Sequence, residues 1–101
     1  MRFEWDPTKD QANQTKHGLS FKEAIELFKA GVDYLEIYDE EHSDQEDRFI
    51  AIGPIRRGVI VVAYTEREDD VLRILSARMA TNKERKRYEK SQGGKNERRD
   101  S

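Results

Sequence analysis

Two long apolar runs separated by a short charged turn constrain the fold of this chain more than any other feature. Val59 to Thr65 is almost entirely apolar or β-branched, and Val71 to Ala77 is similar although it carries Arg73 and Ser76. The segment between them, Glu66 to Asp70, is typical of a turn. The pattern predicts two antiparallel neighbouring strands, central in a sheet and covered by helices on at least one face.

Two further runs extend this sheet. Tyr34 to Tyr38 alternates in polarity, and Arg48 to Gly53 is apolar after its first residue. Gly53-Pro54 and Gly58 mark the turn that follows. Short connections make the four strands an antiparallel meander. Arg2 to Trp5 is a candidate for an extra short strand at the N-terminus.

Three stretches carry helix start and stop signals. Asp6-Pro7 is an N-cap followed by proline, and Gly18 predicts that this first helix ends at about His17. Ser20 to Glu23 is a capping box that opens an amphipathic helix ending near Gly31. A second capping box, Thr81 to Glu84, opens a helix that runs to about Lys90. We therefore predict an α+β fold with two N-terminal helices packed on the four-stranded meander and a C-terminal helix.

Length and composition bound the class of protein. With 101 residues, 40% of them charged, the chain suits one domain over residues 1–90 and a disordered charged tail over 91–101. It has no cysteine, which excludes disulfides and thiolate metal sites and makes the cytoplasm the expected location. The N-terminus lacks the apolar stretch of a signal peptide, and the longest apolar run is too short to span a bilayer.

Charge is distributed unevenly along the chain. Residues 1–72 carry 9 basic and 17 acidic side chains, whereas residues 73–101 carry 10 basic and 4 acidic ones. Two partners of opposite charge could therefore bind different faces of the protein, for example a polyanion on the basic face and a basic protein on the acidic face. A basic solvated tail is the alternative interpretation of the same charge pattern.

Arginines in and around the two apolar strands are the first candidate site. Arg67 follows the first strand, while Arg73 and Arg78 lie on the second with Ser76 between them. Arginine presents a planar set of donors that matches phosphate oxygens. Strand alternation places residues 73 and 78 on opposite faces, so they share a site only if the strand bends. Structural ion pairs are the alternative, more so for Arg73 than for Arg78.

Histidine and carboxylate side chains supply a second candidate. His42, Glu46 and Arg48 lie in an acidic segment, and imidazole and carboxylate are groups that transfer protons. A solvated acidic loop is the alternative. His17 shares a helical face with Asn13, but the chain has only two histidines and no histidine pair spaced as metal ligands.

Together these segments resemble one known family, the BrnT-type ribonuclease toxins. The resemblance rests on Phe3-Glu4-Trp5-Asp6-Pro7, on Lys16-His17-Gly18-Leu19-Ser20-Phe21, on His42-Ser43 with Glu46-Asp47-Arg48, and on Val62 to Arg67 followed by Arg73 to Arg78. It covers roughly residues 3–89 in conserved order. Met79 departs from the family pattern, in which a basic residue is frequent there.

The resemblance implies a RelE-like fold and the toxin of a type II toxin–antitoxin pair. The toxin would be neutralised by a BrnA-like ribbon-helix-helix antitoxin, and operator DNA would be bound only through the complex. Metal-independent RNA cleavage through the 2′-hydroxyl would need proton transfer from His42, Glu46 or His17, and charge stabilisation by arginine. No cofactor and no metal are expected.

We therefore assign two sets of candidate residues. The catalytic set is His42, Glu46, Arg48, Arg67 and Arg78. The substrate-binding set is His17, Tyr64, Arg73 and Ser76, with Tyr64 stacking on a base or donating to a phosphate. Two alternatives stay open: a non-enzymatic nucleic-acid or protein binding module, and a structural partner in an acidic–basic heterodimer.

Overall fold

The computed structural model describes the backbone of residues 1–29 and 31–100, and it combines a five-stranded sheet with three α-helices. In chain order the elements are β1 (Arg2–Glu4), α1 (Pro7–His17), α2 (Phe21–Ala24), the 3-10 turn η1 (Ile25–Phe28), β2 (Leu35–Tyr38), the 3-10 turn η2 (Glu40–His42), β3 (Arg48–Ile55), β4 (Gly58–Arg67), β5 (Val71–Met79) and α3 (Asn82–Asp100). The α+β class is confirmed.

The sheet differs from the prediction at one edge. Its strand order is β1-β5-β4-β3-β2, and β2 to β5 form the predicted antiparallel meander. The optional N-terminal strand is present, and β1 pairs in parallel with the start of β5, where Arg2 N–H donates to Asp70 O at 2.9 Å. The sheet is therefore five-stranded and mixed, not four-stranded and antiparallel.

Local capping signals position the first two helices. The Asp6 side chain accepts from Thr8 N–H at 2.8 Å, and α1 ends at Gly18 with φ of 68°. The capping box of Ser20 and Glu23 is formed as predicted. The helix it opens is shorter than expected, because α2 tightens after one turn into η1, which ends at Phe28 instead of near Gly31.

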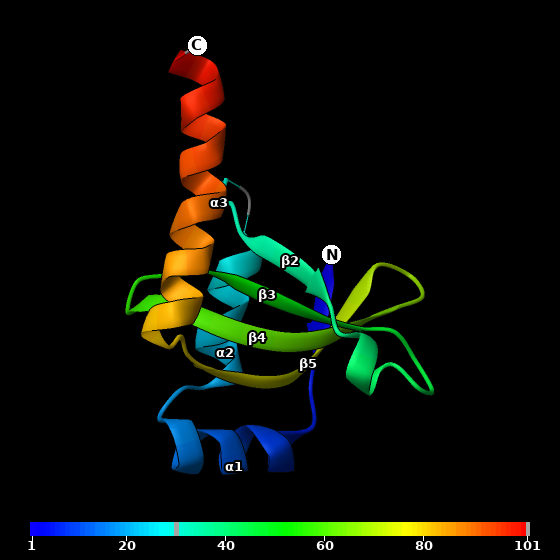
Figure 1. The fold of residues 1–101 in the computed structure, drawn as a ribbon. Helices are drawn as coiled ribbons and strands as arrows, with labels where there is room; N and C mark the ends of the chain where they lie inside the picture. Colours follow the sequence, from blue (N-terminus) through cyan, green and yellow to red (C-terminus); the bar gives the residue numbers. More distant parts are fainter. Residues whose placement is uncertain (30, 101) are drawn as a thin grey trace.

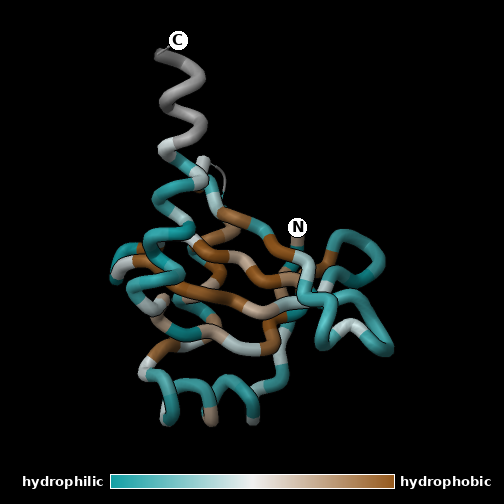
Figure 2. Tube along the Cα trace, in the orientation of Figure 1, coloured by the Kyte–Doolittle hydropathy of each residue, from teal (hydrophilic) through white to brown (hydrophobic). Residues whose placement is uncertain are grey.

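The helical layer and the sheet enclose one core. Behind the sheet in Figure 1, α2 and η1 cover one face, and Figure 2 shows how apolar residues concentrate in the strands. Phe21 and Leu27 from this layer pack on Val62, Tyr64 and other strand residues, all of them fully buried. We call this side of the sheet the core face and the opposite side the outer face.

Helix α1 is attached to β5 through one buried side chain, Asn13. Its amide donates to Leu19 O and Ala77 O, both at 2.8 Å, and its carbonyl accepts from Ala77 N–H at 3.2 Å. Because β1 pairs only with residues 71–73, the rest of this edge of β5 lacks a neighbouring strand. Asn13 satisfies the backbone of that open edge.

Helix α3 crosses the outer face, in front of the sheet in Figure 1. Glu84 bonds to Arg78 of β5, and the Tyr88 hydroxyl donates to Asp33 O just before β2. The helix runs to Asp100, whereas the prediction ended it near Lys90; Lys, Arg, Glu and Gln in this stretch have high helix propensity. The predicted tail over 91–101 lies partly outside the described residues and stays a prediction. None of the described helices is long and apolar enough to cross a membrane.

Candidate functional site

A β-bulge decides which side chains share the outer face. Ala63 pairs with Ser76 but Tyr64 pairs with Ile74, so Leu75 is an extra residue in β5. Arg73, Ser76 and Arg78 therefore lie opposite Thr65, Ala63 and Val61, which alternate regularly on β4. Directly paired residues point to the same face. The three β5 residues thus share the outer face, whereas unbroken alternation predicted that residues 73 and 78 point to opposite sides.

One row of this face carries two arginines. Arg48 of β3 pairs with Thr65 of β4, which pairs with Arg73 of β5, which pairs with Glu4 of β1. Neighbouring strands lie about 4.8 Å apart, so the two arginine Cα atoms are roughly 10 Å apart. Thr65 sits between them, 1% exposed, and its hydroxyl has no hydrogen-bond partner among the residues that the structure describes.

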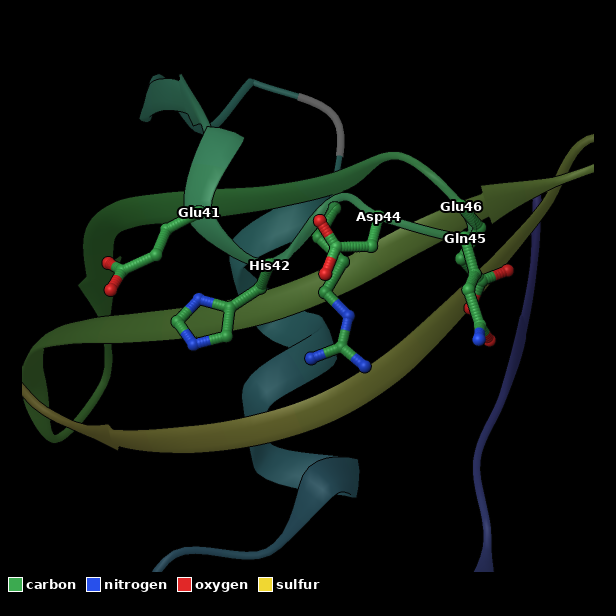
Figure 3. Close-up of a pocket in the computed structure, with 6 residues that line it drawn as sticks. Glu41, His42, Asp44, Gln45 and Glu46 are labelled. Carbon is green, nitrogen blue, oxygen red and sulfur yellow. The ribbon is translucent and has the colours of Figure 1, made fainter.

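An open cavity of about 570 Å³ lies at the β3 end of this row. It is lined by Glu41, His42, Asp44, Gln45, Glu46 and Arg48. In the view of Figure 3, His42 and Glu46 lie well apart, with Asp44 between them. The structure thus brings together three of the predicted catalytic residues, His42, Glu46 and Arg48. Within the described part of the chain, no group of three or more His, Asp and Glu side chains is arranged to hold a metal ion.

His42 is oriented by a carboxylate that the sequence prediction did not single out. Its Nδ1 lies 3.0 Å from Asp39 Oδ2, and Asp39 is only 16% exposed whereas His42 is 59% exposed. The Asp39 oxygens accept from Nδ1–H, which leaves Nε2 as the free ring atom. The i, i+3 spacing of Asp39 and His42, with Asp39 just before the 3-10 turn η2, is the sequence signal that could have revealed this pair.

Arg67 and Arg48 differ in how freely their charge is available. Arg67 Nη2 lies 3.7 Å from Glu46 Oε2, with both side chains close to half exposed, so this is a loose surface pair. The Arg48 guanidinium has no ion-pair partner in residues 1–29 and 31–93, whose side chains are described. Arg48 is therefore the cation in the cavity that is most available to an anionic ligand.

Arg73 and Arg78 are each held by an acid. Arg73 Nη1 bonds to Glu4 Oε2 at 2.7 Å, as the alternative of a structural pair anticipated. Arg78 makes a bidentate pair with Glu84 at 2.7 and 2.8 Å, which holds α3 to the sheet. The hydrogen bonds from Arg78 lower the pKa of Glu84 to about 2, and the same pair raises the pKa of Arg78. The sequence interpretation favoured Arg78 over Arg73 for phosphate, whereas the structure places both arginines in ion pairs.

Two predicted substrate-binding residues lie away from the cavity. Tyr64 is fully buried on the core face, against Phe28 and Phe49, and its hydroxyl donates to Glu36. Burial, followed by that hydrogen bond, raises its pKa. Stacking of Tyr64 on a base is therefore excluded in this conformation, and the prediction is corrected: alternation on β4 turns Tyr64 inward.

His17 ends α1 at the opposite end of the sheet. Its neighbour Gly18 accepts from Arg57 at 2.8 Å, in the turn between β3 and β4, whereas His42 precedes the start of β3. β3 is eight residues long, so at the usual rise of about 3.4 Å per residue its start, near His42, and its end, near Arg57, are more than 20 Å apart. His17 is therefore not brought to the cavity.

Comparison with known proteins gives a consistent result. Residues 5–84 match the family described as the ribonuclease toxin BrnT of type II toxin–antitoxin systems. The crystal structure of the Brucella abortus ribonuclease toxin BrnT is similar, with 28% sequence identity and a TM-score of 0.61, over 81% of this chain and 99% of that one. None of the curated proteins compared with the chain matches it.

Proposed function

Because the chain belongs to the BrnT family of ribonuclease toxins of type II toxin–antitoxin systems, we propose that it cleaves RNA by 2′-hydroxyl attack, without a metal ion, in the cavity beside η2. The observation that carries this proposal is the meeting of His42, Glu46 and Arg48 around one open cavity. Two groups able to transfer protons flank a cation there, and this is the set that the reaction needs.

The proposed reaction has one bond-forming and one bond-breaking event at phosphorus. A base removes the proton of the ribose 2′-hydroxyl, and the 2′-oxygen attacks the adjacent phosphorus. The bond from phosphorus to the 5′-oxygen of the next nucleotide breaks, and an acid protonates that oxygen. The products are a 2′,3′-cyclic phosphate and a 5′-hydroxyl end, and no oxidant or water is consumed.

Glu46 is the base and His42 the acid in this scheme. Glu46 is exposed beside Arg67 and lines the cavity, so its carboxylate can accept the proton of the 2′-hydroxyl. Asp39 orients the His42 ring through Nδ1, which leaves Nε2 free to donate a proton to the leaving 5′-oxygen. Glu46 and His42 both line the cavity and lie apart in the view of Figure 3, and such a separation suits attack and departure on opposite sides of phosphorus.

Arginine stabilises the charge that develops on the phosphate oxygens. Arg48 lies in the cavity and is free of an acidic partner among the described side chains, so it is the principal stabilising cation. Arg73 is two strands away in the same row, bonded to Glu4, and Ser76 follows it on the same face. These two residues bind the substrate next to the reacting phosphate, and Arg78 contributes indirectly by holding α3.

Leaving-group chemistry tests the two proton-transfer roles separately. We expect His42→Ala to lower cleavage of an RNA oligonucleotide by about 10² to 10⁴-fold. It should have little effect on uridine 3′-(4-nitrophenyl phosphate), whose leaving group departs without a proton. Glu46→Gln should slow both substrates. Arg48→Ala should also slow both substrates, because Arg48 is the principal stabilising cation. The matched controls are His17→Ala, which removes the chain's other histidine, for His42→Ala, and Arg56→Ala in the exposed β3–β4 turn for Arg48→Ala.

Equal activity of wild type and folded His42→Ala on RNA would contradict the site assignment. If His42→Ala lost activity on the nitrophenyl substrate while Glu46→Gln kept it, His42 would be the base and Glu46 the acid. Circular dichroism and thermal unfolding check the fold of each variant.

An antitoxin partner follows from the family, and we propose that it is a BrnA-like ribbon-helix-helix protein that neutralises the toxin and binds operator DNA in the complex. Growth should stop when this chain is expressed alone and should recover when the protein encoded beside it is co-expressed. Arrest that the neighbouring protein does not relieve would contradict this assignment.

A further inference from the structure

Helix α3 carries a stripe of four basic side chains that form no hydrogen bond or ion pair with the described side chains of the protein. Lys83, Lys86, Arg87 and Lys90 are all exposed and follow each other at spacings of three, one and three residues. At 100° per residue they occupy about 100° of the helix circumference. Between residues 83 and 90 no acidic residue falls within that arc, so this part of the helix presents a uniformly cationic stripe.

A different side of the helix faces the protein. Glu84, Tyr88 and Ser91 are partly buried, and their spacing of four and three residues puts them on a common side. Glu84 bonds to Arg78, and Tyr88 bonds to Asp33 O at 3.1 Å. These contacts fix the rotation of α3 about its axis, and thereby fix the direction in which the basic stripe points.

The position of α3 relates the stripe to the proposed cavity. The helix crosses from β5 to β2 and packs on β3 over the same outer face that carries Arg48, Arg73 and Ser76. Arg78, which anchors α3, pairs with Val61, four residues along β4 from Thr65 in the arginine row. This places the anchor roughly 14 Å from that row along the strand.

We propose that the Lys83–Lys90 stripe binds the phosphate backbone of the RNA substrate on one side of the cleaved bond. Charge complementarity supports RNA as the occupant: the stripe is cationic, RNA is the polyanion that a ribonuclease toxin cleaves, and the cavity itself is rimmed by acids. The stripe is roughly 10 Å long, and Arg78, which anchors its helix, stands roughly 14 Å from the arginine row, so an RNA of several nucleotides is needed to reach both. This inference rests on the proposed function for the identity of the ligand.

Binding of an uncleavable RNA isolates the stripe from the chemistry. The probe is a fluorescent 20-nucleotide RNA, fully 2′-O-methylated (about 20 phosphates, each one negative charge), and anisotropy gives its Kd at several salt concentrations. The variant changes Lys83, Lys86, Arg87 and Lys90 to Gln, which keeps helix propensity and the contacts of Glu84 and Tyr88. The matched control changes four lysines of the helical layer to Gln, namely Lys9, Lys16, Lys22 and Lys29, all exposed.

The stripe variant should raise Kd on the order of 10-fold or more at low salt and make the plot of log Kd against log salt less steep by up to about 3. The control variant, with the same net charge, should change Kd far less. Equal Kd and slope in wild type and the stripe variant, or equal losses in both variants, would overturn the inference. If wild type binds through the stripe but does not cleave unmodified RNA, the proposed function fails and the binding surface stands.

Discussion

Thr65 combines near-complete burial with an unpaired hydroxyl at the centre of the arginine row. An unsatisfied buried hydroxyl costs roughly 1 to 3 kcal/mol, and valine has the same shape and suits a strand. Thr65→Val should therefore leave the free energy of unfolding unchanged or raise it by about 1 kcal/mol. Urea unfolding measures the change. A loss of more than 1 kcal/mol, roughly the worth of one hydrogen bond, would mean that the hydroxyl is satisfied in solution.

Asp39 is a positioning residue for His42 in the proposed reaction. Asp39→Asn replaces the accepting carboxylate by an amide and should lower kcat on RNA at least about 10-fold, with little change in KM, because the ring loses its orientation. As with His42→Ala, the nitrophenyl substrate should be spared. Asp44→Asn, in the same cavity, is the control. Equal losses on both substrates would indicate a structural role instead.

Sequence patterns predicted single residues well where local geometry decides, and less well where it does not. The capping roles of Asp6, Ser20 and Glu23 follow from short-range signals and are confirmed. The prediction that Arg73 and Arg78 point to opposite faces of the sheet was wrong, because no residue type in the sequence marks the bulge at Leu75. The acidic partner of Arg73, Glu4, lies 69 residues away in the sequence, so no local pattern could predict that ion pair.

At the scale of elements, Asn13 links α1 to the open edge of β5. Asn13→Ala removes three hydrogen bonds and leaves the N–H and C=O of Ala77 without their partner. We expect a loss of about 2 to 4 kcal/mol in the free energy of unfolding. The neighbouring exposed Gln14→Ala is the control, measured by urea unfolding. A change below about 0.5 kcal/mol, the size usual for surface substitutions, would show that α1 contributes little to the fold.

The attachment of α3 should be sensitive to acid. The pKa of Glu84 is about 2 in the folded state against an ordinary value of 4.5, so its stabilising pair with Arg78 is complete above about pH 4.5 and is lost as pH falls toward 2. Glu84→Gln keeps the capping box of α3 but removes the charge. It should cost about 1 kcal/mol at neutral pH, and stability should fall less steeply than in wild type between pH 4.5 and 2.

Thermal unfolding across that pH range measures the difference, with Glu89→Gln on the exposed side of the same helix as control. Parallel stability curves for wild type and Glu84→Gln would show that the ion pair does not hold α3.

Most elements were predictable because their signals are local. The strands β2 to β5 lie within two residues of their predicted bounds, since hydrophobic runs and turn residues mark them. The pairing of β1 was not predictable, because three residues carry little pattern and their partner is about 70 residues away. The end of α3 was predicted near Lys90, because Gly93-Gly94 and the many charged residues after it do not favour a continued helix, whereas the helix runs to Asp100.

At the scale of the whole molecule, charge separates along the sheet. The segment from η2 to β3 and the β4–β5 turn lie at the same end, since Arg48 and Arg73 are both neighbours of Thr65. Exposed acids crowd that end: Glu40, Glu41, Asp44, Glu46, Asp47, Glu66, Glu68, Asp69 and Asp70. The basic stripe of α3 lies toward the other end. RNA would therefore approach the cavity from the side of α3.

The chemical nature of the cleaved ends tests the central claim most directly. Purified protein is incubated in EDTA with an RNA oligonucleotide and, in a parallel reaction, with a DNA oligonucleotide of the same sequence. The masses of the products are then measured by mass spectrometry. Attack by the 2′-hydroxyl should give 2′,3′-cyclic phosphate and 5′-hydroxyl ends from the RNA, and the deoxy substrate should not be cleaved. Products with 5′-phosphate ends, or cleavage that EDTA abolishes and Mg²⁺ restores, would contradict it.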